Sequence, residues 1–324
     1  MLEKIHKYRA GGILGVAMYS KFACSKYKRK DPEFYDKLCH MYDQLKRAYI
    51  CNNLRKKLKK QIDIYKNEIV KEYNALPHAH EKVIWVCWLK GIENAPKIVR
   101  MCYQSILDNF SKDYKIITLS DDNIDKYITL PEYIVEKYKS GVISPQLYSD
   151  AVRLELLDKY GGTWMDATIF CSGGAIPKFM LEDDLFTFQM LWYATWGMAT
   201  VTNLFFLSAC QNNKIIKLTK YLFFNYLKHH DIMADYWLID DMFDIAIKEF
   251  PDEWSNVVPV ECLTMHVLQD HLRKHFDKRL FDITISRMPF HKLTWRVPNE
   301  GYGENTLCNY LFSKYPIYGE NNFE

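Results

Sequence analysis

No Cys-x-x-Cys pair occurs in the 324-residue sequence, although it contains nine cysteines. Cysteines that are scattered and odd in number indicate neither a zinc site nor a disulfide framework, and they suit a reducing compartment. No apolar run reaches the roughly 20 residues that a membrane-spanning helix needs. A signal-peptide pattern, internal repeats and low-complexity tracts are also lacking. These absences argue against a disulfide-stapled or repeat architecture, and they predict a cytoplasmic protein without a membrane span.

Positive charge is unevenly distributed along the chain. Residues 1–75 contain 18 Lys and Arg against 8 Asp and Glu, a net charge of +10, whereas residues 76–324 contain 25 against 32, a net charge of −7. A hydrophobic content of 48% and an aromatic content of 15% argue against disorder. We therefore predict a basic helical segment over residues 1–76, followed by one catalytic domain over residues 77–324.

The basic segment has the pattern of amphipathic helices. Asp31 followed by Pro32 is typical of a helix start. Apolar residues then recur at helical spacing, at Phe34, Leu38, Met41, Leu45 and Tyr49. A basic run follows over residues 55–60. Such a run can lie on an anionic membrane surface, bind nucleic acid or form a solvated helix face, and composition alone leaves all three open.

Strand and helix patterns alternate after residue 77. Residues 82–88 form an apolar run of the kind expected for a strand buried in a parallel sheet. A helical pattern over 97–109 and a second strand over 114–119 complete a βαβ unit, which implies a right-handed crossover. Further strands are predicted over 185–190 and 205–209, and further helices over 213–229, 235–250 and 301–313. The predicted fold class is therefore α/β.

The stretch over residues 144–170 concentrates the chemically informative residues. It predicts a helix from Pro145, ended by Gly161 and Gly162, and then one strand over residues 163–170. Asp150 and Arg153 lie three residues apart and share a helix face. Side chains alternate along a strand, so Trp164, Asp166 and Thr168 should point the same way.

Two interpretations of these charged residues stay open on spacing alone. Asp166 can hold a divalent cation against a diphosphate, since hard cations prefer oxygen ligands, or it can cap a turn at the end of the strand. Asp150 and Arg153 can bind a ribose hydroxyl and a phosphate, or they can form a structural ion pair.

A resemblance favours the functional interpretation. Ser149-Asp150-x-x-Arg153, Tyr160-Gly161-Gly162, Trp164 and Asp166-Ala167-Thr168 resemble the sugar-nucleotide core of the DxD glycosyltransferases, especially the bacterial capsular polysaccharide synthesis proteins. The resemblance covers roughly residues 80–300 and implies a GT-A fold, a Rossmann-like mixed sheet flanked by helices. Thr168 stands where the wider group has a second acid, as it does in the capsular subgroup.

The resemblance also implies roles for particular residues. Asp166 and Thr168 would hold Mn²⁺ or Mg²⁺. Donor binding would involve Trp88, which would stack on the nucleotide base, and Ser149, Asp150, Arg153, Gly162 and Trp164. His291 and Lys292 lie in a His-Lys-Leu-Thr-Trp segment that matches the capsular proteins, and they would neutralise the leaving diphosphate. Each of these residues could instead serve only packing or structure.

An acid-containing helix follows the metal strand in the resembling proteins, and the predicted helix over 235–250 contains Asp240 and Asp241. Adjacent residues cannot share one helix face, so we expect one of them to meet the acceptor or donor sugar and the other to face solvent. A solvated helix face is the simpler alternative for both.

The implied reaction is transfer of a hexose from a nucleotide diphosphate sugar, most simply a UDP sugar, to a hydroxyl of a capsular or other surface polysaccharide repeat unit, with retention at the anomeric carbon. A lipid-linked acceptor and a peripheral position on the inner face of the cell membrane, through residues 1–75, would follow, and nucleic acid is not an expected partner. Two rivals remain: a transferase of a nucleotidyl or phosphosugar unit, and a catalytically silent scaffold in a membrane polysaccharide-synthesis complex.

Overall fold

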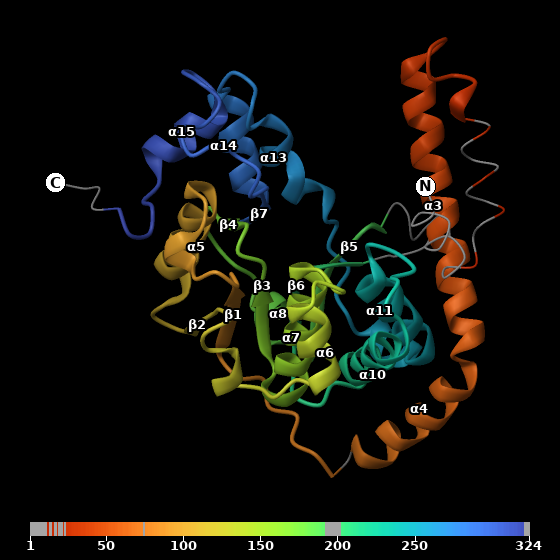
Figure 1. The fold of residues 1–324 in the computed structure, drawn as a ribbon. Helices are drawn as coiled ribbons and strands as arrows, with labels where there is room; N and C mark the ends of the chain where they lie inside the picture. Colours follow the sequence, from red (N-terminus) through yellow and green to blue (C-terminus); the bar gives the residue numbers. More distant parts are fainter. Residues whose placement is uncertain are drawn as a thin grey trace.

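A computed structural model describes residues 24–73, 75–191 and 202–320, together with residues 12, 15, 18 and 22. Its centre is a five-stranded mixed sheet with the strand order β2-β1-β3-β6-β5 (Figure 1). The strands are β1 (Val83–Cys87), β2 (Lys115–Leu119), β3 (Gly162–Met165), β5 (Leu185–Gln189) and β6 (Thr202–Ala209). Strands β2, β1 and β3 are parallel, whereas β6 and β5 run antiparallel to their neighbours. The predicted α/β class is confirmed.

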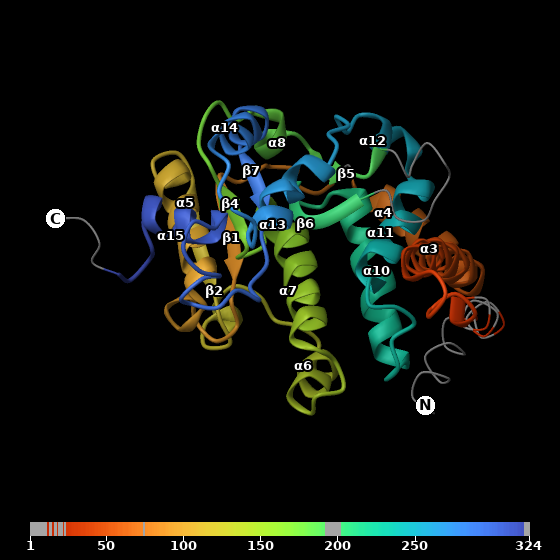
Figure 2. The same cartoon turned by 90° about the horizontal axis from the view of Figure 1, so that it is seen from above.

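Helices cover both faces of this sheet, as the view from above shows (Figure 2). The helices on one face are α6 (Glu132–Lys139), α7 (Pro145–Tyr160), α10 (Lys214–His229) and α11 (Leu238–Glu249). The other face carries α5 (Lys97–Phe110), α8 (Phe179–Glu182), η3 (Leu263–His266), α13 (Val267–His271), α14 (Lys278–Arg287) and α15 (Leu307–Lys314). A two-stranded antiparallel sheet of β4 (Ile169–Cys171) and β7 (Phe290–Lys292) lies on that second face. Short elements η1 (Ile92–Asn94), η2 (Ile124–Lys126) and α12 (Pro251–Ser255) connect these parts.

Strand alternation divides the buried apolar side chains between the two faces. In β1, Trp85 and Cys87 belong to the cluster beneath α7 and α10, whereas Ile84 and Val86 belong to the cluster beneath α5. All four are buried. A strand that is covered on both sides is apolar at every position, which is the pattern that the sequence shows over residues 82–88.

The helix that precedes the central motif begins and ends as its sequence predicts. The Ser144 hydroxyl accepts a hydrogen bond from the Leu147 amide, and Pro145 occupies the first turn. Gly161 has a φ of 67° and ends α7, and its amide donates to the Leu157 carbonyl. Gly162 has a φ of 91°. A Cβ on Gly162 would lie 2.6 Å from the Val83 carbonyl oxygen, so β3 can pair closely with β1 only with glycine here.

The predicted single strand over residues 163–170 is wrong. Strand β3 ends at Met165, a turn follows over 166–168, and β4 begins at Ile169. The Ile169 amide donates to the Asp166 carbonyl at 2.9 Å, which closes the turn. The two strands belong to different sheets, because β3 pairs with β1 and β6 while β4 pairs with β7.

The basic amino-terminal segment forms two long helices, α3 (Pro32–Lys57) and α4 (Lys59–Tyr73), packed beside α10 and α11 (Figure 1). The predicted start is confirmed, because the Asp31 carboxylate accepts a hydrogen bond from the Phe34 amide. Four side chains of the apolar series, those of Phe34, Met41, Leu45 and Tyr49, are exposed. No helix among the described residues is both long enough and apolar enough to cross a membrane.

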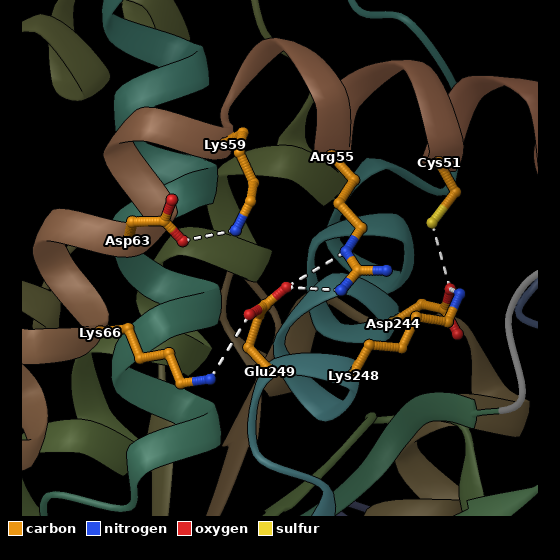
Figure 3. A network of polar contacts seen from close by, with 8 residues as sticks. All are labelled: Cys51, Arg55, Lys59, Asp63, Lys66, Asp244, Lys248 and Glu249. Carbon is orange, nitrogen blue, oxygen red and sulfur yellow. Dashed lines mark hydrogen bonds and ion pairs between the residues drawn. The ribbon is translucent and has the colours of Figure 1, made fainter.

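Charged side chains attach this segment to α11 (Figure 3). Arg55 donates to Glu249 at 2.7 and 3.1 Å, and Lys66 lies 3.5 Å from the second Glu249 oxygen. The Cys51 thiol donates to the Asp244 carboxylate at 3.1 Å. Part of the basic run is therefore neutralised within the protein.

Candidate functional site

The carboxyl ends of the three parallel strands meet at one edge of the sheet. Trp88 directly follows β1, Asp121 follows β2 by two residues, and Asp166 directly follows β3. The strand order reverses between β1 and β3, because β2 lies on one side of β1 and β3 lies on the other. In open α/β sheets, ligands bind outside the carboxyl ends of strands at such a switch point. Asp166 therefore lies where sheets of this kind bind their ligands.

Six side chains from α7, β3, the turn over residues 166–168 and β7 converge on this edge. Arg153 of α7 lies 3.2 Å from Oδ1 of both Asp150 and Asp166. The Trp164 indole N–H donates to Asp166 Oδ1 at 3.0 Å. Lys292 of β7 donates to Asp166 Oδ2 at 2.7 Å, and to the Thr168 hydroxyl at 2.6 Å. The predicted common orientation of Trp164, Asp166 and Thr168 holds for these contacts, although a turn rather than a strand produces it.

The Arg153 guanidinium is fixed from several directions. Besides the two carboxylates, its Nη1 donates to the Leu204 carbonyl at 2.6 Å, and its carbon lies 4.9 Å from the centre of the Trp164 ring. A planar guanidinium can make such contacts at once, because its donors form a rigid fork and its face stacks on aromatic rings. Arg153 and Asp150 are both buried.

The two site carboxyls have opposite pKa shifts. Burial alone would raise the pKa of Asp166, but the nearby Lys292 and Arg153 charges outweigh it, so the pKa lies below its usual range. Burial raises the pKa of Asp150 to about 7 against the opposing effect of Arg153. Asp150 Oδ2 has no hydrogen-bond partner in the part of the chain that the structure describes. One carboxyl is therefore held ionised, and the other keeps an oxygen without a partner.

Asp240 and Asp241 lie at the start of α11, and both are buried. The expectation that one of them faces solvent is wrong, because α3 covers the outer side of α11. Asp240 lies near Arg153 and Arg47, and burial raises its pKa to about 6. Asp241 lies near Asp235 and Arg47, and burial raises its pKa well above the usual range. Asp240 borders the Arg153 cluster, whereas Asp241 faces the contact with the amino-terminal helices.

The remaining predicted residues take different positions. Ser149 lies one turn before Arg153, and its hydroxyl contacts the Cys87 thiol at the end of β1. Trp88 is partly buried at the same edge. Gly162 lies at the opposite end of β3, packed against Val83.

His291 is turned away from Asp166, since it is next to Lys292 in a strand and points to the other side. Its Nε2 lies 3.1 Å from the Ser172 hydroxyl, and burial lowers its pKa to about 4. The structure therefore brings Trp88, Ser149, Asp150, Arg153, Trp164, Asp166, Thr168, Asp240 and Lys292 toward one edge, and leaves out Gly162, Asp241 and His291.

Three neighbours of the cluster, Phe205, His266 and Asp121, are not among the residues predicted from the sequence. The Lys292 ammonium lies 5.4 Å from the centre of the Phe205 ring, and Phe205 makes an edge contact with His266 at 5.7 Å. Asp121 accepts a hydrogen bond from the Tyr138 hydroxyl at 3.2 Å. Its position after a predicted strand could have identified Asp121 by the rule applied to Asp166, whereas no local pattern points to His266.

The arrangement does not fit a divalent cation as it stands. The two proposed ligand atoms, on Asp166 and Thr168, both accept hydrogen bonds from Lys292, and the other Asp166 oxygen contacts Trp164 and Arg153. Among the described residues, no three His, Cys, Asp or Glu side chains lie close enough together to hold a metal ion. The predicted Mn²⁺ or Mg²⁺ stays a prediction.

Comparison with known proteins assigns the chain to a protein family. Residues 34–311 match the family of capsular polysaccharide synthesis proteins, and the chain belongs to that family. Family membership supports a role in capsular polysaccharide synthesis. The match includes α4 and all but the first two residues of α3, a segment for which the sequence offers composition alone.

Comparisons with solved structures and with curated proteins do not extend this family assignment. A solved structure described as "PaToxG Glycosyltransferase" is similar at 19% identity, covering 61% of this chain and 83% of that chain, with a TM-score of 0.35. A likeness at that TM-score carries no argument about function. None of the curated proteins compared with this chain matches it significantly.

Proposed function

We propose that this chain transfers a hexose from a nucleotide diphosphate sugar, most simply a UDP sugar, to a hydroxyl of a capsular polysaccharide repeat unit. The observation that supports this most is the convergence of Arg153 and Lys292 on Asp166, at the carboxyl edge beside the point where the strand order reverses. Two cations at a strand edge suit a diphosphate. Two nearby carboxyls, Asp150 and Asp166, can accept hydrogen bonds from ribose or sugar hydroxyls.

The proposed GT-A reaction needs charge stabilisation and positioning from the protein. The bond between the anomeric carbon and the diphosphate oxygen breaks, and its electron pair leaves with the nucleoside diphosphate. The acceptor oxygen bonds to the same carbon and gives its proton to a leaving phosphate oxygen. Attack from the face that the diphosphate leaves would retain the anomeric configuration. Lys292 and Arg153 would stabilise the charge that develops on the diphosphate, and Trp88 would lie against the nucleotide base.

A nucleotide-binding experiment tests this proposal directly. Purified protein is titrated calorimetrically with UDP, GDP, ADP and CMP, and then incubated with the matching sugar nucleotides and an oligosaccharide acceptor. We expect binding of one nucleoside diphosphate, release of that diphosphate on turnover, and loss of turnover in Asp166→Ala. Release of a nucleoside monophosphate would favour the rival transferase of a phosphosugar unit. A folded protein that binds no nucleotide would favour the scaffold.

We also propose that α3 holds the enzyme on an anionic membrane surface, near a lipid-linked acceptor at the inner face of the cell membrane. Exposed apolar side chains recur along the helix at Phe34, Met41, Leu45 and Tyr49. Basic side chains with an adjacent apolar face are typical of helices that lie in a membrane interface. Cosedimentation with vesicles of anionic and of zwitterionic lipid is the measurement, and equal recovery with both would contradict the proposal. Retention on DNA or RNA at moderate salt would favour the nucleic-acid alternative.

A further inference from the structure

The two atoms expected to bind a divalent cation already contact a cation of the protein. Lys292 Nζ lies 2.7 Å from Asp166 Oδ2 and 2.6 Å from the Thr168 hydroxyl oxygen. Divalent cations lie about 2.0–2.6 Å from their oxygen ligands. The ammonium therefore occupies the position between these two oxygens in which a metal ion would be placed.

The backbone fixes Lys292 in this position. Residue Lys292 is opposite Ile169 in the β4–β7 pair. The next amide, that of Leu293, donates to the Thr168 carbonyl at 2.9 Å. Backbone pairing at Lys292 and at Leu293 thus holds Lys292 beside the turn over residues 166–168. A lysine on a paired strand is better positioned than one on a loop.

The charge of Asp166 is compensated without a metal ion. Asp166 contacts two cations, Arg153 and Lys292. A lysine ammonium has three donors, and the contacts with Asp166 and Thr168 use two of them. For the third donor, the described part of the chain provides no hydrogen-bond acceptor. This third donor is suited to an oxygen of the diphosphate, which would bring the negative charge that a metal ion otherwise offsets.

We propose that the Lys292 ammonium is the resident cation of the donor site and replaces the divalent metal ion, so that the nucleoside diphosphate binds without one. The inference rests on the proposed function, because it presumes that the donor is a nucleotide diphosphate sugar. It adds to the proposed function that the cation of the donor site is a side chain of the protein. Asp166 and Thr168 then hold Lys292 in place, as positioning residues for the ammonium.

Calorimetric titration with UDP, in EDTA and in excess Mn²⁺, tests the proposal. We expect dissociation constants that agree within about threefold for the wild-type protein, a difference of less than about 0.7 kcal/mol. Mn²⁺ alone, followed by electron paramagnetic resonance, should show no tight binding. Removing the ammonium in Lys292→Met should weaken UDP binding in EDTA by about tenfold or more. Mn²⁺ should partly restore binding in that variant, because its Asp166 and Thr168 oxygens are open to a metal.

Lys214→Met is the matched control. Lys214 has the same side-chain exposure as Lys292, 19%, and also pairs with a carboxylate, that of Glu253, away from the site. It should leave UDP binding unchanged. Lys292→Arg keeps the charge and reports on folding if Lys292→Met is unstable, and it should retain binding in EDTA.

The outcomes separate the two proposals. UDP binding by the wild-type protein only when Mn²⁺ or Mg²⁺ is present would overturn the role of Lys292 and leave the proposed function standing. Equal dissociation constants for UDP in EDTA in Lys292→Met and in the wild-type protein would also overturn the role of Lys292. A folded protein that binds none of the nucleoside diphosphates under either condition would overturn the proposed function, and this inference with it.

Discussion

The Arg153 guanidinium contacts Asp150, Asp166, the Leu204 carbonyl and the Trp164 ring. A lysine at this position would keep the charge but could not form the fork that joins these groups. Arg153→Lys should therefore lower the free energy of unfolding by about 2–4 kcal/mol, since breaking a buried charge network leaves charges uncompensated. Urea denaturation measures this change. The exposed Arg279 provides the control, and Arg279→Lys should change stability by less than about 0.5 kcal/mol. Equal effects of both substitutions would contradict the network.

Asp241 predicts a dependence of stability on pH. Burial raises its pKa well above the usual range, with Asp235, Arg47, Asp240 and Asp244 nearby. The folded protein then keeps a proton that the unfolded chain releases above about pH 4, so stability falls as the pH rises toward the folded pKa. Asp241→Asn stays uncharged and should flatten this decline, gaining stability relative to the wild-type protein as pH rises.

Thermal unfolding at several pH values between about 5 and 8 checks this, because the unfolded carboxyl is ionised throughout that range. The control is Asp252→Asn on the exposed side of α12, which should follow the wild-type curve. A wild-type curve that rises with pH, together with an unchanged slope in Asp241→Asn, would show that Asp241 ionises normally.

At the scale of elements, the junction between α7 and β3 depends on glycine. A Cβ on Gly162 would lie 2.5 Å from Val83 Cγ1 and 2.6 Å from the Val83 carbonyl oxygen. Gly162→Ala should therefore destabilise the fold by about 2 kcal/mol or more, through backbone strain together with overpacking. Gly174 has a similar φ, 95° against 91°, but nothing within 4 Å of its Cβ position. Gly174→Ala should thus show the backbone contribution alone, and chemical denaturation of both variants compares them.

Periodicity was sufficient to predict most elements. The apolar run of β1, the helix α7 with its Ser144 cap, and the strands β5 and β6 lie close to their predicted positions. The break after Met165 was missed because Ala167, Thr168 and Ile169 are all compatible with an extended strand. What separates β4 from β3 is pairing with β7, more than 100 residues later, and no local pattern specifies such a partner.

In the candidate site, too, local patterns predicted some contacts, whereas others depend on pairing between distant segments. Asp150 and Arg153 share a helix face by spacing, and the structure pairs them at 3.2 Å. The resemblance, rather than spacing, pointed to Lys292, whose side chain reaches Asp166 only through β-strand pairing. The burial of Asp240 and Asp241 was not predictable from α11 itself, since the covering helix α3 belongs to a segment that was treated as separate.

At the scale of the whole molecule, the amino-terminal helices have two different sides. One side contributes Ile50, Leu54 and Ile62 to the apolar cluster shared with α10 and α11. The other side exposes the apolar series of α3, with Met41 at 68% and Leu45 at 44% exposure. A buried apolar side and an exposed apolar side suit helices that pack on the rest of the protein and also contact a second surface.

The membrane proposal therefore predicts a position-dependent effect. Met41→Glu should reduce recovery with anionic vesicles by about tenfold or more, since it removes apolar burial and adds a repelled charge. Ile64→Glu changes a residue of α4 that is also exposed, at 50%, outside the α3 series, and should bind vesicles nearly as the wild-type protein does. Equal losses in both variants would indicate general damage, and no loss in either would place the membrane contact elsewhere.

The pairing of β4 with β7 also sets an order of assembly. Asp166 and Lys292 are 126 residues apart in the chain, so the ammonium reaches the carboxylate only after nearly the whole protein has been synthesised and folded. A chain that ends before residue 290 could complete the five-stranded sheet, yet Arg153 would be the only one of the two site cations present. Sugar-nucleotide binding of the proposed kind would then report completion of the fold, and a local opening of the three-residue strand β7 would switch it off while the sheet stayed intact.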